Sequence, residues 1–177
     1  MQQFSDEQLI QVYQINKGEK GQMAFTLLYN GYAKIMLNYF YFSLHYDHNK
    51  AQDLVQDLFV RILERHHTFN NNQFFKPWIY KIASNMCNDE YRKNNVINKY
   101  NNLIKSSSEV ITLNSETEEE LRKCINALDK DQRSLIVLRF KLKLSIKEIA
   151  QIYDCPEGTI KSRLFYATKE LSKLFKI

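Results

Sequence analysis

Residues 144–164 read LSIKEIAQIYDCPEGTIKSRL and contain the start signals of two helices separated by a turn. Ser145 and Glu148 form the S-x-x-E pair of a capping box, which marks the start of a helix. Pro156 favours the first turn of a second helix, after a break around Tyr153–Cys155. A short helix, a tight turn and a longer basic helix are typical of a helix-turn-helix.

The second helix of this pair exposes side chains that suit contacts with DNA. A helix in the major groove needs donors for base edges and phosphates, mainly near its N-terminus. The exposed or partly exposed positions are Thr159, Lys161, Ser162, Phe165, Tyr166 and Lys169. Taken alone, the same pattern also fits an ordinary amphipathic helix with one solvated face.

The net charge of +5 is unevenly distributed along the chain. Residues 1–108 carry +3, residues 109–120 carry −5, and residues 121–177 carry +7. A basic C-terminal third is expected of a surface that binds phosphates. The acidic run Glu116–Glu120 is expected to be a solvated helix start, where the helix dipole favours negative charge.

Turn-forming residues are scarce, which favours long helices over a sheet. The 177 residues include only four glycines and two prolines, too few turns for a many-stranded sandwich or barrel. A second capping box, Ser5 to Gln8, starts the first helix. Apolar periodicity indicates further helices near 21–40, 51–63, 74–92, 116–128 and 130–140. We therefore expect an all-α protein.

The periodicity fades between residues 95 and 115, where Asn, Ser, Lys and Thr predominate and three serines occupy 106–108. Such a composition predicts a flexible linker. We expect two small helical domains, residues 1–94 and 116–177, joined by the linker 95–115.

Several classes of function lack their sequence signatures. Cys87, Cys124 and Cys155 are odd in number and too far apart for a C-x-x-C zinc pair, so we expect small core or turn residues in a reducing compartment. The first residues lack a secretory signal, and the apolar stretch 33–44 is too short to span a membrane. No P-loop, G-x-S-x-G or H-E-x-x-H motif is present. We expect a cytoplasmic protein that is not an enzyme and has no cofactor, metal or membrane insertion.

Two segments of the N-terminal half carry polar groups that a core cannot use. On the helix near 51–63, apolar residues face inward while Asp53, Gln56 and Asp57 share the outer side.

The second segment, residues 68–73, supplies four amides and Phe69, and it lies next to a helix start with Lys76, Trp78 and Lys81. Amide groups can hydrogen-bond to the edge of an unpaired base, and an aromatic side chain can pack against its face. Asn-rich segments are also good turns, and a Trp is often a core anchor.

Two separate segments resemble the extracytoplasmic-function (ECF) sigma factors of bacterial RNA polymerase. Residues 144–164 resemble region 4 of that family, and AQDLVQDLF at 51–59 with PWIYKIASN at 77–85 resembles region 2. The resemblance covers nearly the whole chain and implies that residues 1–94 bind core polymerase and open the minus-10 element. Residues 116–177 would read the minus-35 element. The implied partners are the β and β′ subunits of polymerase, promoter DNA and an anti-sigma factor.

The resemblance and the residues together define three candidate sites. The polymerase-binding stretch holds Asp53, Gln56, Asp57 and Phe59, although a Phe at that spacing usually packs inside. The minus-10 site holds Phe69, Asn70, Asn71, Asn72, Lys76, Trp78 and Lys81. The minus-35 site holds Thr159, Lys161, Ser162, Arg163, Phe165 and Tyr166.

This chain departs from the family pattern at a few positions. Asp154 stands where glycine is common, in a turn that calls for a positive φ, which Asp tolerates better than most residues. Tyr166 and Thr168 replace usual arginines, so fewer phosphate contacts and a shallower salt dependence are expected.

Two other functions fit parts of the sequence. One is a helix-turn-helix regulator whose N-terminal bundle senses a ligand or dimerises, and it would bind duplex DNA without polymerase. The other is a di-iron oxidase bundle, suggested by the Glu-x-x-His spacing of Glu64 and His67, of which the chain has a single copy.

Overall fold

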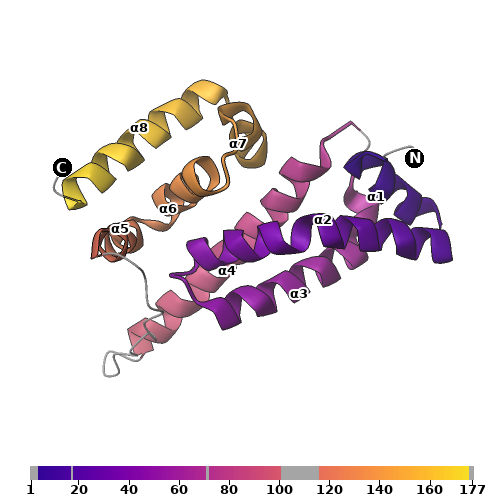
Figure 1. Cartoon of the computed structure of the whole chain (residues 1–177), viewed down its shortest axis with the longest axis horizontal. Helices are drawn as coiled ribbons and strands as arrows, with labels where there is room; N and C mark the ends of the chain where they lie inside the picture. The colour runs from indigo at the N-terminus through magenta and orange to yellow at the C-terminus, as the bar shows by residue number, and fades with distance from the viewer. Residues whose placement is uncertain (1–3, 17, 71, 101–115, 176–177) are drawn as a thin grey trace.

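The computed structural model describes residues 4–16, 18–70, 72–100 and 116–175, and of these it describes 94–100 and 116–118 by their backbone only. These residues form eight α-helices and two short helical turns, η1 and η2, and they include no strand (Figure 1). The prediction of an all-α protein is confirmed.

The N-terminal unit contains α1 (Asp6–Ile15), α2 (Glu19–Ser43), α3 (His48–Arg65), η1 (His66–Thr68) and α4 (Phe75–Tyr100). The predicted capping box starts α1, with Ser5 N donating to Gln8 Oε1 at 2.8 Å. Helices α2, α3 and α4 pack around large side chains that are fully buried, among them Tyr39, Phe40 and Tyr80. Tyr39 and Phe40 belong to the wide apolar face of α2, and Tyr80 of α4 packs against Tyr39.

Helix α4 is longer than the sequence predicts. Pro77 lies in its first turn as expected, but the helix continues beyond Arg92 to Tyr100. The first six residues of the predicted linker, 95–100, are therefore helical, and 101–115 lie outside the described residues.

The C-terminal unit contains α5 (Glu116–Ala127), α6 (Lys130–Ile136), the π-helical turn η2 (Val137–Lys141), α7 (Ile146–Tyr153) and α8 (Glu157–Leu174). The capping box of α7 has both of its bonds, since Glu148 N donates to Ser145 Oγ and Ser145 N donates to Glu148 Oε2. Asp154 ends α7 with φ 51°, the left-handed conformation that the turn was expected to need. The helix-turn-helix is confirmed.

The two units pack against each other. In Figure 1 the orange and yellow C-terminal helices lie along one side of the indigo and magenta N-terminal helices. Helix α7 contacts α4, and both α6 and η2 contact α2. One buried apolar cluster runs through both units and includes Met36, Tyr80, Leu138 and Ile149. The described helices thus form one closed body with a shared core.

The three cysteines are free, as the sequence predicts. Cys87 and Cys124 are buried, and Cys155 is half-buried in the turn after α7. Burial raises the pKa of the Cys87 thiol to about 12, so it is an unreactive core group. Within the described part of the chain, every helix is too short or too polar to cross a bilayer.

Candidate nucleic-acid interface

The outer side of α3 carries the predicted polar stripe. Asp53, Gln56 and Asp57 are all exposed, because the opposite side of the helix is buried against α2 and α4. Phe59 does not belong to this stripe. Its ring is buried and stacks against the rings of Phe25 and Tyr29, with centroids 6.0 and 4.6 Å away. Phe59 therefore anchors α3 in the core and is not available on its outer surface.

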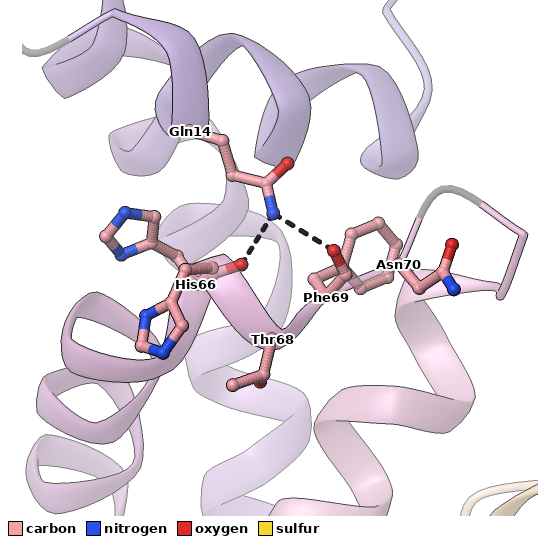
Figure 2. Close-up of a pocket in the computed structure, with 6 residues that line it drawn as sticks. Gln14, His66, Thr68, Phe69 and Asn70 are labelled. Carbon is pink, nitrogen blue, oxygen red and sulfur yellow. Dashed lines mark hydrogen bonds between the residues drawn. The ribbon is translucent and has the colours of Figure 1, made fainter.

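The loop between α3 and α4 begins with the single turn of η1 and borders an open hollow of about 600 Å³. The hollow is lined by Gln14 of α1 and by residues 66–70 (Figure 2). Two predicted residues, Phe69 and Asn70, belong to it. Gln14, His66 and His67 were not predicted for this site, because α1 is distant in the chain and the two histidines match no DNA-binding pattern.

Phe69 and Asn70 are held in different ways. The Phe69 ring is buried and meets the ring of Trp78 edge-on at 5.3 Å, so it forms a wall and offers no exposed face. Asn70 is exposed, and its Oδ1 accepts a bond from Asn72 N at 3.1 Å. This is the Asx turn of an ordinary loop, and it leaves the Asn70 amide NH₂ available. Asn71 lies outside the described residues.

A second hollow of about 350 Å³ lies where the loop and α4 meet the helix-turn-helix. Its lining from the N-terminal unit includes Asn72, Trp78 and Lys81, while Gln151 and Asp154 come from α7 and the turn after it. Of the described residues predicted for the minus-10 site, Phe69 and Asn70 line the first hollow, Asn72, Trp78 and Lys81 line the second, and Lys76 lines neither. The second hollow is closed on one side by the unit predicted to read a different DNA element.

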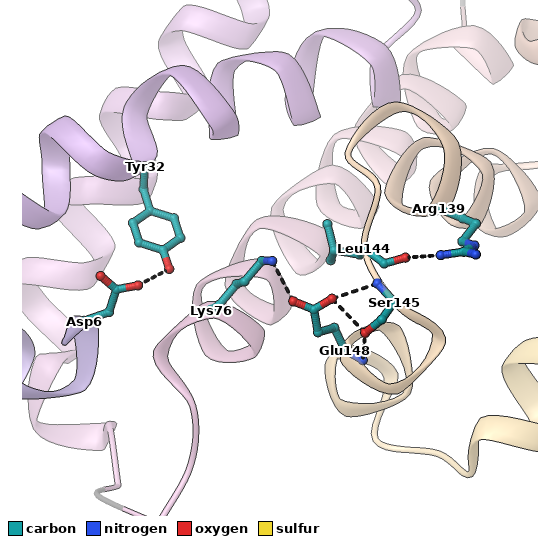
Figure 3. A network of polar contacts seen from close by, with 7 residues as sticks. All are labelled: Asp6, Tyr32, Lys76, Arg139, Leu144, Ser145 and Glu148. Carbon is teal, nitrogen blue, oxygen red and sulfur yellow. Dashed lines mark hydrogen bonds and ion pairs between the residues drawn. The ribbon is translucent and has the colours of Figure 1, made fainter.

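Two lysines predicted to contact DNA phosphates are paired with carboxylates of the C-terminal unit. Lys76 Nζ lies 2.6 Å from Glu148 Oε1 (Figure 3), and Lys81 Nζ lies 3.8 Å from Asp154 Oδ2. Partial burial opposes ionisation of Glu148, but hydrogen bonds from Lys76 and Ser145 outweigh it and lower its pKa to about 2. A phosphate that approaches these lysines must compete with the two carboxylates.

Arg133 is the central polar residue of the contact between the units. It is buried, and its guanidinium donates to the carbonyls of Ile125, Asn126 and Leu128 at the end of α5. The same group donates to His45 Nε2 at 2.7 Å and to the Tyr91 hydroxyl at 3.2 Å, both in the N-terminal unit. One side chain therefore caps α5 and joins it to the α2–α3 turn.

The α2–α3 turn holds His45 in an unusual conformation. His45 and Tyr46 have φ values of 60° and 66°, in the left-handed region that non-glycine residues seldom adopt. Burial, and then the Arg133 guanidinium, lower the pKa of His45 to about 4. The imidazole is therefore neutral at physiological pH, with Nε2 free of a proton to accept from Arg133.

Helix α8 presents the predicted recognition surface to solvent. Lys161, Ser162, Arg163, Phe165 and Tyr166 are exposed and Thr159 is half-exposed. Phe165 and Tyr166 each keep 61% of their surface accessible, which is unusual for large aromatic side chains. On the other side, Ile160, Leu164 and Ala167 pack into the unit. The surface combines cations, a hydroxyl and flat apolar groups, as major-groove contacts require.

The helix-turn-helix and the exposed polar surfaces are consistent with a DNA-binding protein, and comparison with known proteins identifies its class. The sequence pattern of Sigma-70 region 2 matches residues 28–96, and that of Sigma-70, region 4 matches residues 118–171. Together they span more than half of the chain. Each match lies within one of the two packed units, and α1 lies outside both.

Relatives match along most of the chain. The RNA polymerase sigma-H factor of Pseudomonas aeruginosa is 28% identical over 186 residues, covering 97% of this chain and 94% of that protein. The ECF RNA polymerase sigma factor SigX of Bacillus subtilis is 28% identical over 160 residues, covering 84% and 82%. The sigma factor RpoE of Bartonella quintana, crystallised with the anti-sigma factor NepR, matches with a TM-score of 0.69 and 28% identity over 86% of this chain and 97% of that one.

The chain belongs to the ECF sigma factors of the sigma-70 family. It is a DNA-binding transcription initiation factor and not an enzyme.

Proposed function

We propose that the chain directs core RNA polymerase to promoters by dividing the work among three surfaces. The α3 stripe of Asp53, Gln56 and Asp57 binds the β and β′ subunits. The loop after η1, with Asn70 and Asn72, captures an unpaired base of the minus-10 element. The exposed face of α8 reads the minus-35 element in duplex DNA. The protein works in the cytoplasm, where polymerase and DNA are.

The observation that carries this proposal is the position of the loop hollow. It lies at the end of α3 beyond the polar stripe, and it is lined by the exposed amide of Asn70 and by the imidazoles of His66 and His67. Such polar groups can bond the edge of a base once the duplex is open. A regulator that binds only duplex DNA has no use for this arrangement.

The proposed phosphate contacts of Lys76 and Lys81 depend on the contact between the two units. Both are paired with carboxylates of the helix-turn-helix, so phosphates compete with these carboxylates while the units are packed and meet no such competition once the units have separated. An anti-sigma factor that binds these units would act on the same equilibrium. RpoE of Bartonella quintana was crystallised with such a partner, which supports a similar partner for this chain.

The deciding experiment uses the full chain with bacterial core polymerase. We expect co-purification with the core and run-off transcripts from a genomic library that share a common promoter. Replacing Asn70 and Asn72 by Ala should leave core binding intact and stop promoter opening, measured by permanganate reactivity of minus-10 thymines. Tight duplex binding without polymerase and no transcripts would instead identify a conventional regulator.

A further inference from the structure

Helix α1 holds the beginning of the base-capture loop through one side chain. Gln14 Nε2 donates to the carbonyl oxygen of His66 at 2.6 Å and to that of Phe69 at 3.1 Å (Figure 2). These two carbonyls bracket the η1 turn, and no other side chain of the described residues bonds to either of them. The two amide hydrogens of Gln14 thus fix where the loop leaves α3.

The same helix holds the end of the loop. Phe75 N, at the start of α4, donates to Glu7 Oε1 at 3.0 Å. Partial burial of Glu7 is outweighed by this bond and by others from Ser5 and its own backbone, so its pKa lies below the ordinary value. An ionised carboxylate is favourable at the N-terminus of a helix such as α4. Both ends of the loop are therefore fastened to α1.

Helix α1 is itself a firm support. Its capping box closes its first turn, Leu9 and Ile10 are buried, and the Tyr32 hydroxyl of α2 donates to Asp6 (Figure 3). Near its C-terminal end, the Tyr13 ring packs against the rings of Phe25 and His66 at 5.1 and 5.0 Å. The bonds from Gln14 and Glu7 therefore join the loop to a part of the core.

We propose that Gln14 is a positioning residue for base capture. By holding the carbonyls of His66 and Phe69 on the α1 side, it keeps the Phe69 ring against Trp78 and keeps Asn70 at the edge of the hollow. The captured base meets a loop already in its binding conformation, so ordering of the loop does not reduce the affinity. This inference rests on the proposed role of the loop.

The test compares Gln14→Met, which keeps the length of the side chain and removes both donors, with Gln11→Met as a matched control. Gln11 lies one turn earlier on α1, and its side chain makes no hydrogen bond to the described part of the chain. Each variant is assembled with core polymerase on a promoter recovered by run-off selection and on versions with each base at the captured position. Helicity and melting temperature of each variant are measured beforehand.

We expect Gln14→Met to slow promoter opening about tenfold, equivalent to 1.4 kcal/mol, and to reduce discrimination between bases at one position. A purely structural defect would slow opening on all four promoters alike. Gln14→Lys, whose ammonium can donate to both carbonyls, should restore the discrimination. Gln11→Met should behave as the wild type.

Three results would overturn the inference, and they differ in what else they affect. If Gln14→Met opens and discriminates normally while the Asn70 and Asn72 variant fails, the loop captures a base without help from Gln14. If both variants open the promoter normally, the proposed capture by the loop is also wrong. Equal slowing on all four promoters would show that Gln14 only stabilises the loop and has no part in distinguishing the bases.

Discussion

Lys76 of the N-terminal unit and Glu148 of the C-terminal unit form an ion pair with 2.6 Å between Nζ and Oε1. Glu148 also accepts the capping bond from Ser145 N, through its other oxygen. The pair therefore links the start of α4 to the first turn of the helix-turn-helix. A lysine predicted to contact DNA is held by a carboxylate of its own chain.

Glu148→Gln should loosen the contact between the units without unfolding α7, because Gln also serves in a capping box. The ion pair is partly exposed, so its loss is expected to shift the equilibrium between closed and separated units by about 0.5–1 kcal/mol. Small-angle scattering should show a larger average radius of gyration. Glu170→Gln, which breaks the exposed pair with Lys173 inside α8, is the matched control and should leave the radius unchanged.

Arg133→Met should be the most destabilising substitution at the contact between the units. It leaves three carbonyls of α5 and the groups of His45 and Tyr91 without their donor, and we expect a loss of about 3 kcal/mol in the free energy of unfolding. Arg139→Met is the control, since Arg139 donates only to the Leu144 carbonyl among the described residues, and about 1 kcal/mol is expected. Equal losses in urea denaturation would contradict the central role of Arg133.

His45 should make the closed body sensitive to mild acid. Its pKa is about 4 in the folded protein against an ordinary 6.5, so between these values the unfolded chain binds more protons. Stability should therefore be full above pH 6.5 and fall as the pH drops toward 4. The groups that face the imidazole are Arg133 and Tyr91, and partial exposure of His45 makes the effect smaller than the shift alone implies.

His45→Asn is the test of this pH dependence, because Asn does not titrate and accepts the positive φ of this position. Melting temperatures measured from pH 7 to pH 4.5 should fall for the wild type and change less for the variant. Below pH 4.5 both should lose stability, as Glu7, Glu90 and Glu148, whose pKa values are lowered, become protonated. Parallel curves above pH 4.5 would show that His45 is not the group responsible.

Reversing the charge of Asp53 and Asp57 to Lys should abolish binding to core polymerase. Both side chains are exposed, so the free energy of unfolding should change by only about 0.5 kcal/mol. Glu64→Lys, an exposed charge reversal further along α3, adds half as much positive charge and shows whether positive charge on this helix is enough to lower the core affinity. A core affinity that is the same for all three proteins would remove the stripe from the interface.

Lys161→Ala should weaken promoter binding by the holoenzyme, by roughly 1–3 kcal/mol if Lys161 contacts a base edge. A phosphate contact would instead give a uniform loss across promoter sequences and a smaller salt slope. Gel shifts over a series of salt concentrations and mutant promoters separate these cases. Lys173→Ala, in the last turn of α8, should have little effect, and the same result for Lys161 would exclude it from the interface.

Features that depend on a few neighbouring residues could be predicted from the sequence. Both capping boxes and the left-handed turn at Asp154 are set within one helical turn, and they appear as expected. The exposed sides of α3 and α8 follow from helical periodicity. The end of α4 could not be predicted, because the Asn and Lys residues after Arg92 form no apolar stripe. The helix nevertheless continues to Tyr100.

Contacts between distant segments could not be predicted in this way. Gln14 and His66 are 52 residues apart, and Lys76 and Glu148 are 72 residues apart. No local pattern couples such residues, since their meeting depends on how complete helices pack. The same holds for Phe69, which was expected to offer a face to a base and instead packs against Trp78.

The shared core of the two units limits the length of DNA that the closed molecule can span. The minus-10 and minus-35 elements lie, by their names, about 25 base pairs apart, roughly 85 Å along B-DNA at 3.4 Å per pair. A compact chain of this length has a radius of gyration of about 16 Å and cannot touch both. Straddling a promoter therefore requires this molecule to open, and the strength of the contacts around Arg133 and Lys76 sets how readily it spans the two elements.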